Sequence, residues 1–117
     1  MRTLIIFAAS AALSSGAWGY TSYDRYQENA NYCDKGSDIT LDTIGTRDAL
    51  VDYEDLLDFD KNAAARQKIY GIIKKRHKGF MGDSSFEFFF GEGWRSNADR
   101  PTDKALRVYE DCMEQRE

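Results

Sequence analysis

The sequence predicts an all-α protein: a small bundle of about four short helices, in which one disulfide joins an N-terminal arm to the C-terminal helix. Two observations support this fold class. Apolar residues recur three and four residues apart in successive segments, which is the spacing of one face of a helix. The chain of 117 residues contains one proline and neither repeats nor low-complexity linkers. Helices of this kind become stable by packing their apolar faces together.

Residues 1–19 have the pattern of a cleaved secretory signal peptide. Arg2 gives the start a positive charge, residues 4–13 form an apolar core, and small residues follow. A membrane-spanning helix needs about 20 apolar residues, so this segment is short for an anchor, which is the alternative. We expect cleavage before Trp18 or Tyr20, a periplasmic or secreted product, and no stable membrane insertion once the signal is removed.

The chain has two cysteines, Cys33 and Cys112. In an exported protein, an even number of cysteines favours a disulfide. The closed loop of about 80 residues would contribute ~4.5 kcal/mol in the chain-entropy model. The alternative is two free thiols buried as small apolar groups.

Residues 20–36 are polar and include four tyrosines. We therefore expect a mostly irregular N-terminal arm that is pinned at Cys33. The helical domain then covers residues 37–117 and opens with a short apolar-periodic stretch, which Gly45 interrupts.

A first full helix is expected over residues 47–58. Thr46 is suited to its N-cap, and Leu50, Tyr53 and Leu57 would form its core-facing stripe. Three acidic residues lie opposite that stripe on a helical wheel and would face solvent: Asp48, Asp52 and Asp55.

The next helix is expected over residues 61–78. Asp60 is suited to its N-cap, and Gly79 stands where a left-handed residue commonly ends a helix. Its apolar stripe consists of Ala65, Ile69, Ile72 and Ile73.

The aromatic segment, residues 84–90, is compatible with a short helix or with a strand. Ser84 and Glu87 have the spacing of a capping box, which favours a helix that ends at Gly91. Residues 91–100 would then form a loop.

Pro101 stands where a last helix can begin, and we expect that helix over residues 102–115. Cys112 lies on its apolar face, in agreement with a disulfide to the arm.

The charges are distributed in blocks. Residues 24–60 hold eleven acids and three bases, whereas residues 61–79 hold seven bases and no acid. The net charge of −4 has the wrong sign for a general nucleic-acid binder. The candidate patch for an anionic partner consists of Lys61, Lys68, Lys74, Lys75, Arg76 and Lys78. Solvated charge at a helix end is the alternative.

A second candidate surface is aromatic. It consists of Phe86, Phe88, Phe89, Phe90 and Trp94. These rings would belong to the core if they are buried, and would form a binding surface if half of them are exposed.

We predict no catalytic residue, no metal site and no cofactor. His77 is the only histidine and the cysteines are assigned to the disulfide, so a zinc or Cys–His site lacks ligands. Asp58, Asp60 and Asn62 follow the first spacings of an EF-hand loop, but the glycine and the final acid that the loop requires are missing.

These features favour an exported, non-enzymatic protein that binds another protein, as a monomer or a homodimer. The format is similar to that of periplasmic inhibitors and immunity proteins. An acid-stress chaperone that exposes its aromatic segment when the acidic side chains are protonated is the first alternative. The second is a small cell-wall hydrolase that uses Glu87 or Glu92 as its acid.

Overall fold

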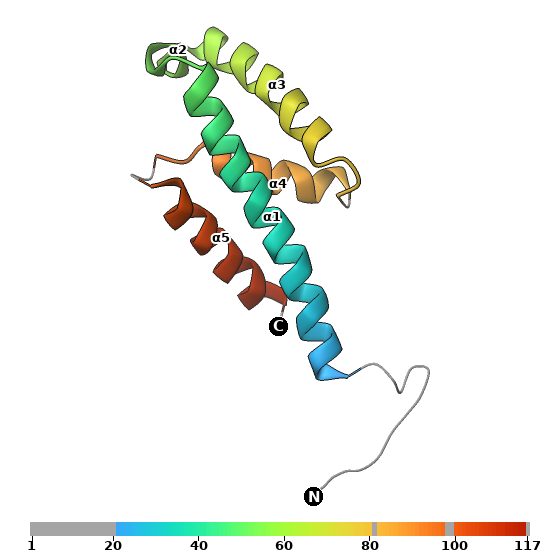
Figure 1. Ribbon diagram of the computed structural model, residues 1–117. Coiled ribbons are helices and arrows are strands. Elements are labelled where there is room, and N and C mark those ends of the chain that lie inside the picture. Colours follow the sequence, from blue (N-terminus) through green and yellow to red (C-terminus); the bar gives the residue numbers. More distant parts are fainter. Residues whose placement is uncertain (1–20, 81, 98–99, 117) are drawn as a thin grey trace, which may run out of the picture. The chain divides into compact units, whose positions relative to one another are not determined.

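The computed structural model describes residues 21–80, 82–97 and 100–116, and every secondary-structure element in them is a helix (Figure 1). The helices are α1 (Ser22–Leu50), α2 (Tyr53–Leu57), α3 (Phe59–Arg76), α4 (Asp83–Trp94) and α5 (Pro101–Arg116). A disulfide joins Cys33 of α1 to Cys112 of α5. The predicted all-α fold and its disulfide are confirmed. The expected signal peptide lies outside the described residues.

The described part of the chain divides into two units, with the boundary between Asn31 and Tyr32. In the first unit, a reciprocal capping box starts α1: the backbone N–H of Asp24 donates to Thr21 Oγ1 at 3.1 Å, and that of Thr21 donates to Asp24 Oδ2 at 2.9 Å. These bonds satisfy N–H groups that a helix start leaves without partners. The prediction of an irregular arm over residues 20–36 is therefore wrong from Ser22 onward.

α1 continues without a break to Leu50, so the predicted helix start at Thr46 is wrong. Gly45 does not interrupt the helix, because one glycine costs a helix interior only about 1 kcal/mol. Thr46 is buried, and its hydroxyl donates to Asp42 Oδ1 one turn earlier, at 3.2 Å. The segment predicted as one helix over residues 47–58 is divided between the end of α1 and the short helix α2.

α3 is capped by Asp58, not by Asp60 as predicted. The Asp58 carboxylate accepts a hydrogen bond from the backbone N–H of Lys61 at 2.9 Å. At the other end, Gly79 has a φ of 93°, so its predicted left-handed conformation is confirmed.

α4 is a helix, as favoured, but it extends past Gly91 to Trp94. Gly82 occupies its N-cap, so the capping box predicted for Ser84 and Glu87 does not form. The predicted loop therefore loses its first four positions, 91–94, to the helix.

Close packing of α1 against α4 explains why glycines lie within these helices. A Cβ on Gly93 would lie 2.6 Å from the carbonyl oxygen of Thr40, and a Cβ on Gly36 would lie 2.3 Å from Phe89 Cζ. Real side chains do not approach this closely, so both positions require glycine for the two helices to cross as they do (Figure 1).

The core of the second unit is aromatic and aliphatic. Tyr70 of α3 packs edge-on against Phe86 and Phe90 of α4, with ring centroids 5.2 and 5.0 Å apart. α5 begins at Pro101, close to its prediction, and buries one face: Ala105, Val108, Cys112 and Met113.

Candidate functional site

Two residues of the predicted basic patch, Lys74 and Arg76, form ion pairs with other parts of the fold. Lys74 forms an ion pair with Asp83 and lies 5.0 Å over the ring of Phe86. Arg76 donates to Asp42 Oδ1 at 2.6 Å, which links α3 to α1. These two cations therefore stabilise contacts between helices, and each is already paired with a carboxylate.

The remaining lysines of the patch point outward. Lys61 lies 3.8 Å from Asp55, and both side chains are exposed. Lys68, Lys75 and Lys78 are exposed and form no ion pair with any part of the chain that the structure describes. The structure thus leaves a sparse row of lysines along α3 and just beyond its end, in place of the predicted cluster.

The predicted aromatic surface is mostly core. Four of its five rings are buried: Phe86, Phe89, Phe90 and Trp94. Phe88 is 51% exposed and lines a groove of about 300 Å³ beside the disulfide. One exposed ring does not make the aromatic binding surface that the sequence suggested, because the helical spacing turns the others inward.

His77 contacts a carboxylate without forming a nucleophilic site. Its Nε2 lies 3.0 Å from Asp42 Oδ2, and Asp42 also accepts from Arg76. Both cysteines are in the disulfide, so neither offers a thiolate. The contact joins the end of α3 to α1.

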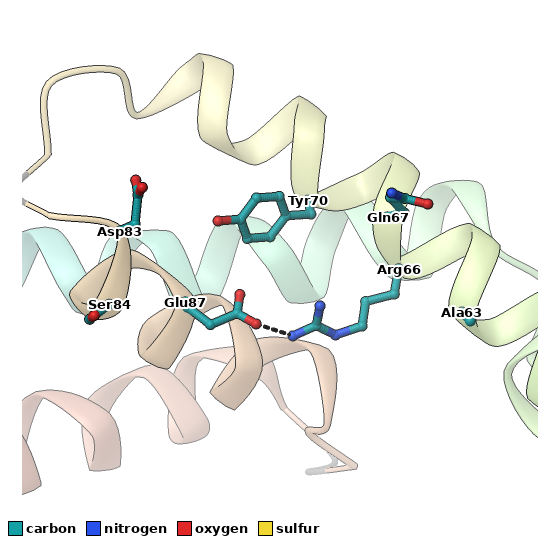
Figure 2. A pocket seen from close by; sticks show the side chains of 7 residues that line it. All are labelled: Ala63, Arg66, Gln67, Tyr70, Asp83, Ser84 and Glu87. Atoms are coloured by element: carbon teal, nitrogen blue, oxygen red, sulfur yellow. Dashed lines mark hydrogen bonds and ion pairs between the residues drawn. The ribbon is translucent and has the colours of Figure 1, made fainter.

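An open pocket of about 670 Å³ lies between α3 and α4 (Figure 2). It is lined by Ala63, Arg66, Gln67, Tyr70, Asp83, Ser84 and Glu87. Figure 2 shows Glu87 directed toward Arg66, and their ion pair measures 2.8 Å. The hydrogen bond from Lys74 lowers the pKa of Asp83. Each carboxylate of this pocket is thus held by a cation from α3.

Glu92, the other carboxylate considered as an acid, is held in the same way. Lys104 of α5 donates to Glu92 Oε1 at 2.9 Å, and Arg95 lies 3.4 Å from Glu92 Oε2. Glu87 and Glu92 therefore act as links between neighbouring elements.

The second unit exposes a group of large apolar side chains from the last residue of α1 to the first residue of α3. Leu50, Tyr53 and Leu57, predicted as a buried stripe, are 57%, 73% and 71% exposed, and Phe59 is 86% exposed. The prediction is wrong because α1 extends through Leu50. This leaves α2 as a separate five-residue helix with no buried residue.

Acidic side chains alternate with these apolar ones. Residues 48–60, which we call the acidic–apolar tip, contain six acids and no base. The acids are Asp48, Asp52, Glu54, Asp55, Asp58 and Asp60. The blockwise charge of the sequence indicated an acidic region, but which apolar residues it exposes depends on where α1 ends.

Three of the six acids make local contacts. Asp48 pairs with Arg47 at 2.9 Å, Asp58 caps α3, and Asp55 lies 3.8 Å from Lys61. Asp52, Glu54 and Asp60 have no ion pair or hydrogen-bonded side chain within the described ranges. The acidic–apolar tip therefore combines uncompensated negative charge with exposed apolar area.

Among the residues that the structure describes, no three His, Cys, Asp or Glu side chains are grouped so that they could hold a metal ion. In that same part of the chain, no helix is long and apolar enough to cross a membrane. Comparison with protein-family models, with curated proteins and with solved structures finds no match for this chain.

Proposed function

We propose that this chain is an exported, non-enzymatic binding protein that engages another periplasmic or secreted protein, as an inhibitor or immunity protein does. The observation that carries the proposal is the exposure of four large apolar side chains within ten consecutive residues, positions 50–59. Grouped exposed apolar residues rimmed by polar ones are typical of protein–protein contact sites. Tyrosine is also among the residues that dominate binding energy at such sites.

The scaffold behind the acidic–apolar tip is well suited to a binding role. The disulfide joins α1 to α5, and ion pairs join α3 to α4 and to α1. A surface held in one conformation loses little entropy on binding, which favours affinity. A disulfide also forms and persists in the oxidising compartments outside the cytoplasm, in agreement with export.

Affinity capture of the oxidised protein from its own organism tests the proposal. The Leu57→Ser/Phe59→Ser double variant removes two apolar side chains that the fold does not bury. Leu106→Ser is a matched control, because Leu106 is 56% exposed on α5. We expect wild type and control to retain one partner protein, and the double variant to lose it.

The captured partner is then purified and its direct binding measured. An enzyme partner whose activity falls on binding would establish inhibition. If the partner binds wild type and the tip double variant equally well, the acidic–apolar tip is not the binding surface and the proposal fails.

One observation favours the acid-stress alternative. The aromatic core lies behind the contact between α3 and α4, and that contact is bridged by the carboxylates of Asp83 and Glu87. Loss of these bridges in acid would loosen the contact and expose phenylalanine rings. This function predicts binding of an apolar dye at a pH of about 3. Unchanged helix packing and no dye binding at that pH would exclude it.

A further inference from the structure

We infer that the partner segment recognised by the acidic–apolar tip is a cationic amphipathic one, with lysine or arginine side chains around apolar anchors. This inference rests on the proposed function for its assumption that the partner is a protein. The arrangement of negative charge and apolar area on the tip supports a cationic amphipathic partner.

The apolar residues of the acidic–apolar tip are placed where they can contact the apolar side chains of a partner. Tyr53 and Leu57 are four residues apart on α2, so their side chains lie on the same side of that helix. Leu50 is the last residue of α1 and Phe59 the first of α3, so each stands at a helix end next to α2. Tyr53 and Leu57 are exposed, and their side chains are therefore free to contact a partner.

The negative charge around these apolar residues favours a cationic partner. Asp52, Glu54 and Asp60 lack charged partners in residues 21–80, 82–97 and 100–116, and no base occurs within the tip. Cations of a partner would pair with these carboxylates, whereas a nucleic acid, an anionic lipid surface or an acidic peptide would be repelled.

The acidic–apolar tip is also held in shape before any partner arrives. Asn62 Nδ2 donates to the carbonyl oxygen of Leu56 at 2.9 Å, and the Asp58 cap fixes the start of α3. These bonds join α2 to α3 and reduce the ordering that binding would require.

A second copy of this chain is a weaker candidate for the occupant. The exposed lysines of α3 are cationic, but no large apolar side chain is exposed among the described residues 60–76. The occupant needs both features on one surface, and the lysine row offers only the charge.

The test uses three synthetic peptides of equal length and the full mature protein. The first peptide is an amphipathic helix of lysine and leucine, the second replaces its lysines with glutamate, and the third replaces its leucines with serine. Binding is measured by calorimetry at low and at physiological salt. We expect the lysine–leucine peptide to bind at least about tenfold more tightly than either of the others, and more weakly as salt is raised.

Two tip variants separate the contributions of charge and apolar area. The Asp52→Asn/Glu54→Gln/Asp60→Asn variant and the Leu57→Ser/Phe59→Ser variant should each weaken binding of the lysine–leucine peptide by about tenfold or more. Glu110→Gln/Asp111→Asn/Glu114→Gln on α5 is the matched charge control, since it also removes three carboxylates and these side chains are exposed and lie outside the tip. This control should bind as wild type does.

Four results would overturn the inference, and the last of them leaves the proposed function standing. One is equal binding of the lysine–leucine peptide by wild type and by both tip variants. Another is binding of the glutamate–leucine peptide as tightly as the lysine–leucine peptide. The third is a self-associating protein whose dimer is abolished by the tip variants, which would make the occupant a second copy. If a captured partner depends on the tip while the lysine–leucine peptide does not bind, the proposed function stands and the inferred chemistry of its partner is wrong.

Discussion

At the scale of single residues, small side chains decide how closely the helices pack. Gly36 and Gly93 lie on facing surfaces of α1 and α4, and the hydroxyl of Thr40 donates to the carbonyl oxygen of Phe89 at 2.9 Å. Such a hydrogen bond across two helices requires their backbones to approach closely. The two glycines and the threonine thus belong to one contact.

Replacing Gly93 by alanine should therefore destabilise the protein by about 2 kcal/mol or more, because the added methyl meets the backbone carbonyl oxygen of Thr40 and the buried side chain of Thr43. Urea unfolding followed by circular dichroism measures this change. Gly45→Ala is the control: nothing lies within 4 Å of its added Cβ, and it should stabilise α1 by up to about 1 kcal/mol. Equal effects of the two substitutions would contradict the close contact.

Two aspartates should respond to pH in opposite directions. Partial burial, with the nearby charge of Asp34, raises the pKa of Asp38. Ionised Asp38 therefore costs the folded state free energy at neutral pH, and that cost disappears as the pH falls below the ordinary carboxyl pKa. Lys74 lowers the pKa of Asp83, so that pair stabilises the fold above the ordinary carboxyl pKa and is lost in acid.

We expect Asp38→Asn to raise the free energy of unfolding at neutral pH by at most about 0.5 kcal/mol, since the side chain is largely exposed. Asp83→Asn should lower it under the same conditions. Both differences should vanish at a pH of about 2, which unfolding curves measured across the pH range would show. A difference that persists in acid would mean that the substitution acts through packing and not through charge.

At the scale of secondary-structure elements, one arginine completes the end of α4. Arg47 of α1 is buried, and its Nη1 donates to the carbonyl oxygens of Trp94 at 2.8 Å and Ser96 at 2.7 Å. The last carbonyl groups of a helix have no partners within the helix and carry partial negative charge. Arg47 thus holds the C-terminal end of α4 against α1.

Arg47→Met keeps the apolar length of the side chain and removes its donors. We expect a loss of about 2–3 kcal/mol in the free energy of unfolding, because buried carbonyl groups lose a charged donor. Hydrogen exchange at the end of α4 should also accelerate. Arg100→Met is the control, since its ion pair with Asp103 is exposed and should change stability by less than about 0.5 kcal/mol. If both variants unfold alike, Arg47 has no special role.

At the scale of the whole molecule, the disulfide links residues that are 79 positions apart. It joins the first and last helices of the second unit, beside the hydrogen bond from Ser37 Oγ to the carbonyl oxygen of Ala105. A crosslink over so long a loop restricts the unfolded chain strongly.

Cys33→Ser/Cys112→Ser should cost about 2–5 kcal/mol, and a domain of this size has little stability to spare. Thermal unfolding with and without reductant measures the change. Wild type should lose stability on reduction, whereas the double variant should be insensitive to reductant. Equal melting temperatures for oxidised and reduced wild type would show that the disulfide is not needed for stability.

Much of the fold could be predicted from local patterns. Helical spacing predicts the last helix and its inward-facing Cys112. Capping preferences predict the position of Gly79, and the even number of cysteines predicts their pairing. The capping box of Thr21 and Asp24 could also be recognised from the spacing of these residues, although the polar segment after it suggested an irregular arm.

Other features of the fold arise at positions where contacts between distant residues outweigh local preference. Gly45, Gly91 and Gly93 look like helix breaks in the sequence, yet a cost of about 1 kcal/mol for each is outweighed by burial of the residues beside them. The buried neighbours are Ile44, Thr46, Phe90 and Trp94. Because α1 therefore runs on to Leu50, the apolar residues that follow cannot turn toward the core. Local patterns indicate an all-α, disulfide-linked domain with charge in blocks. The exposure of apolar side chains in its acidic segment depends instead on where α1 ends.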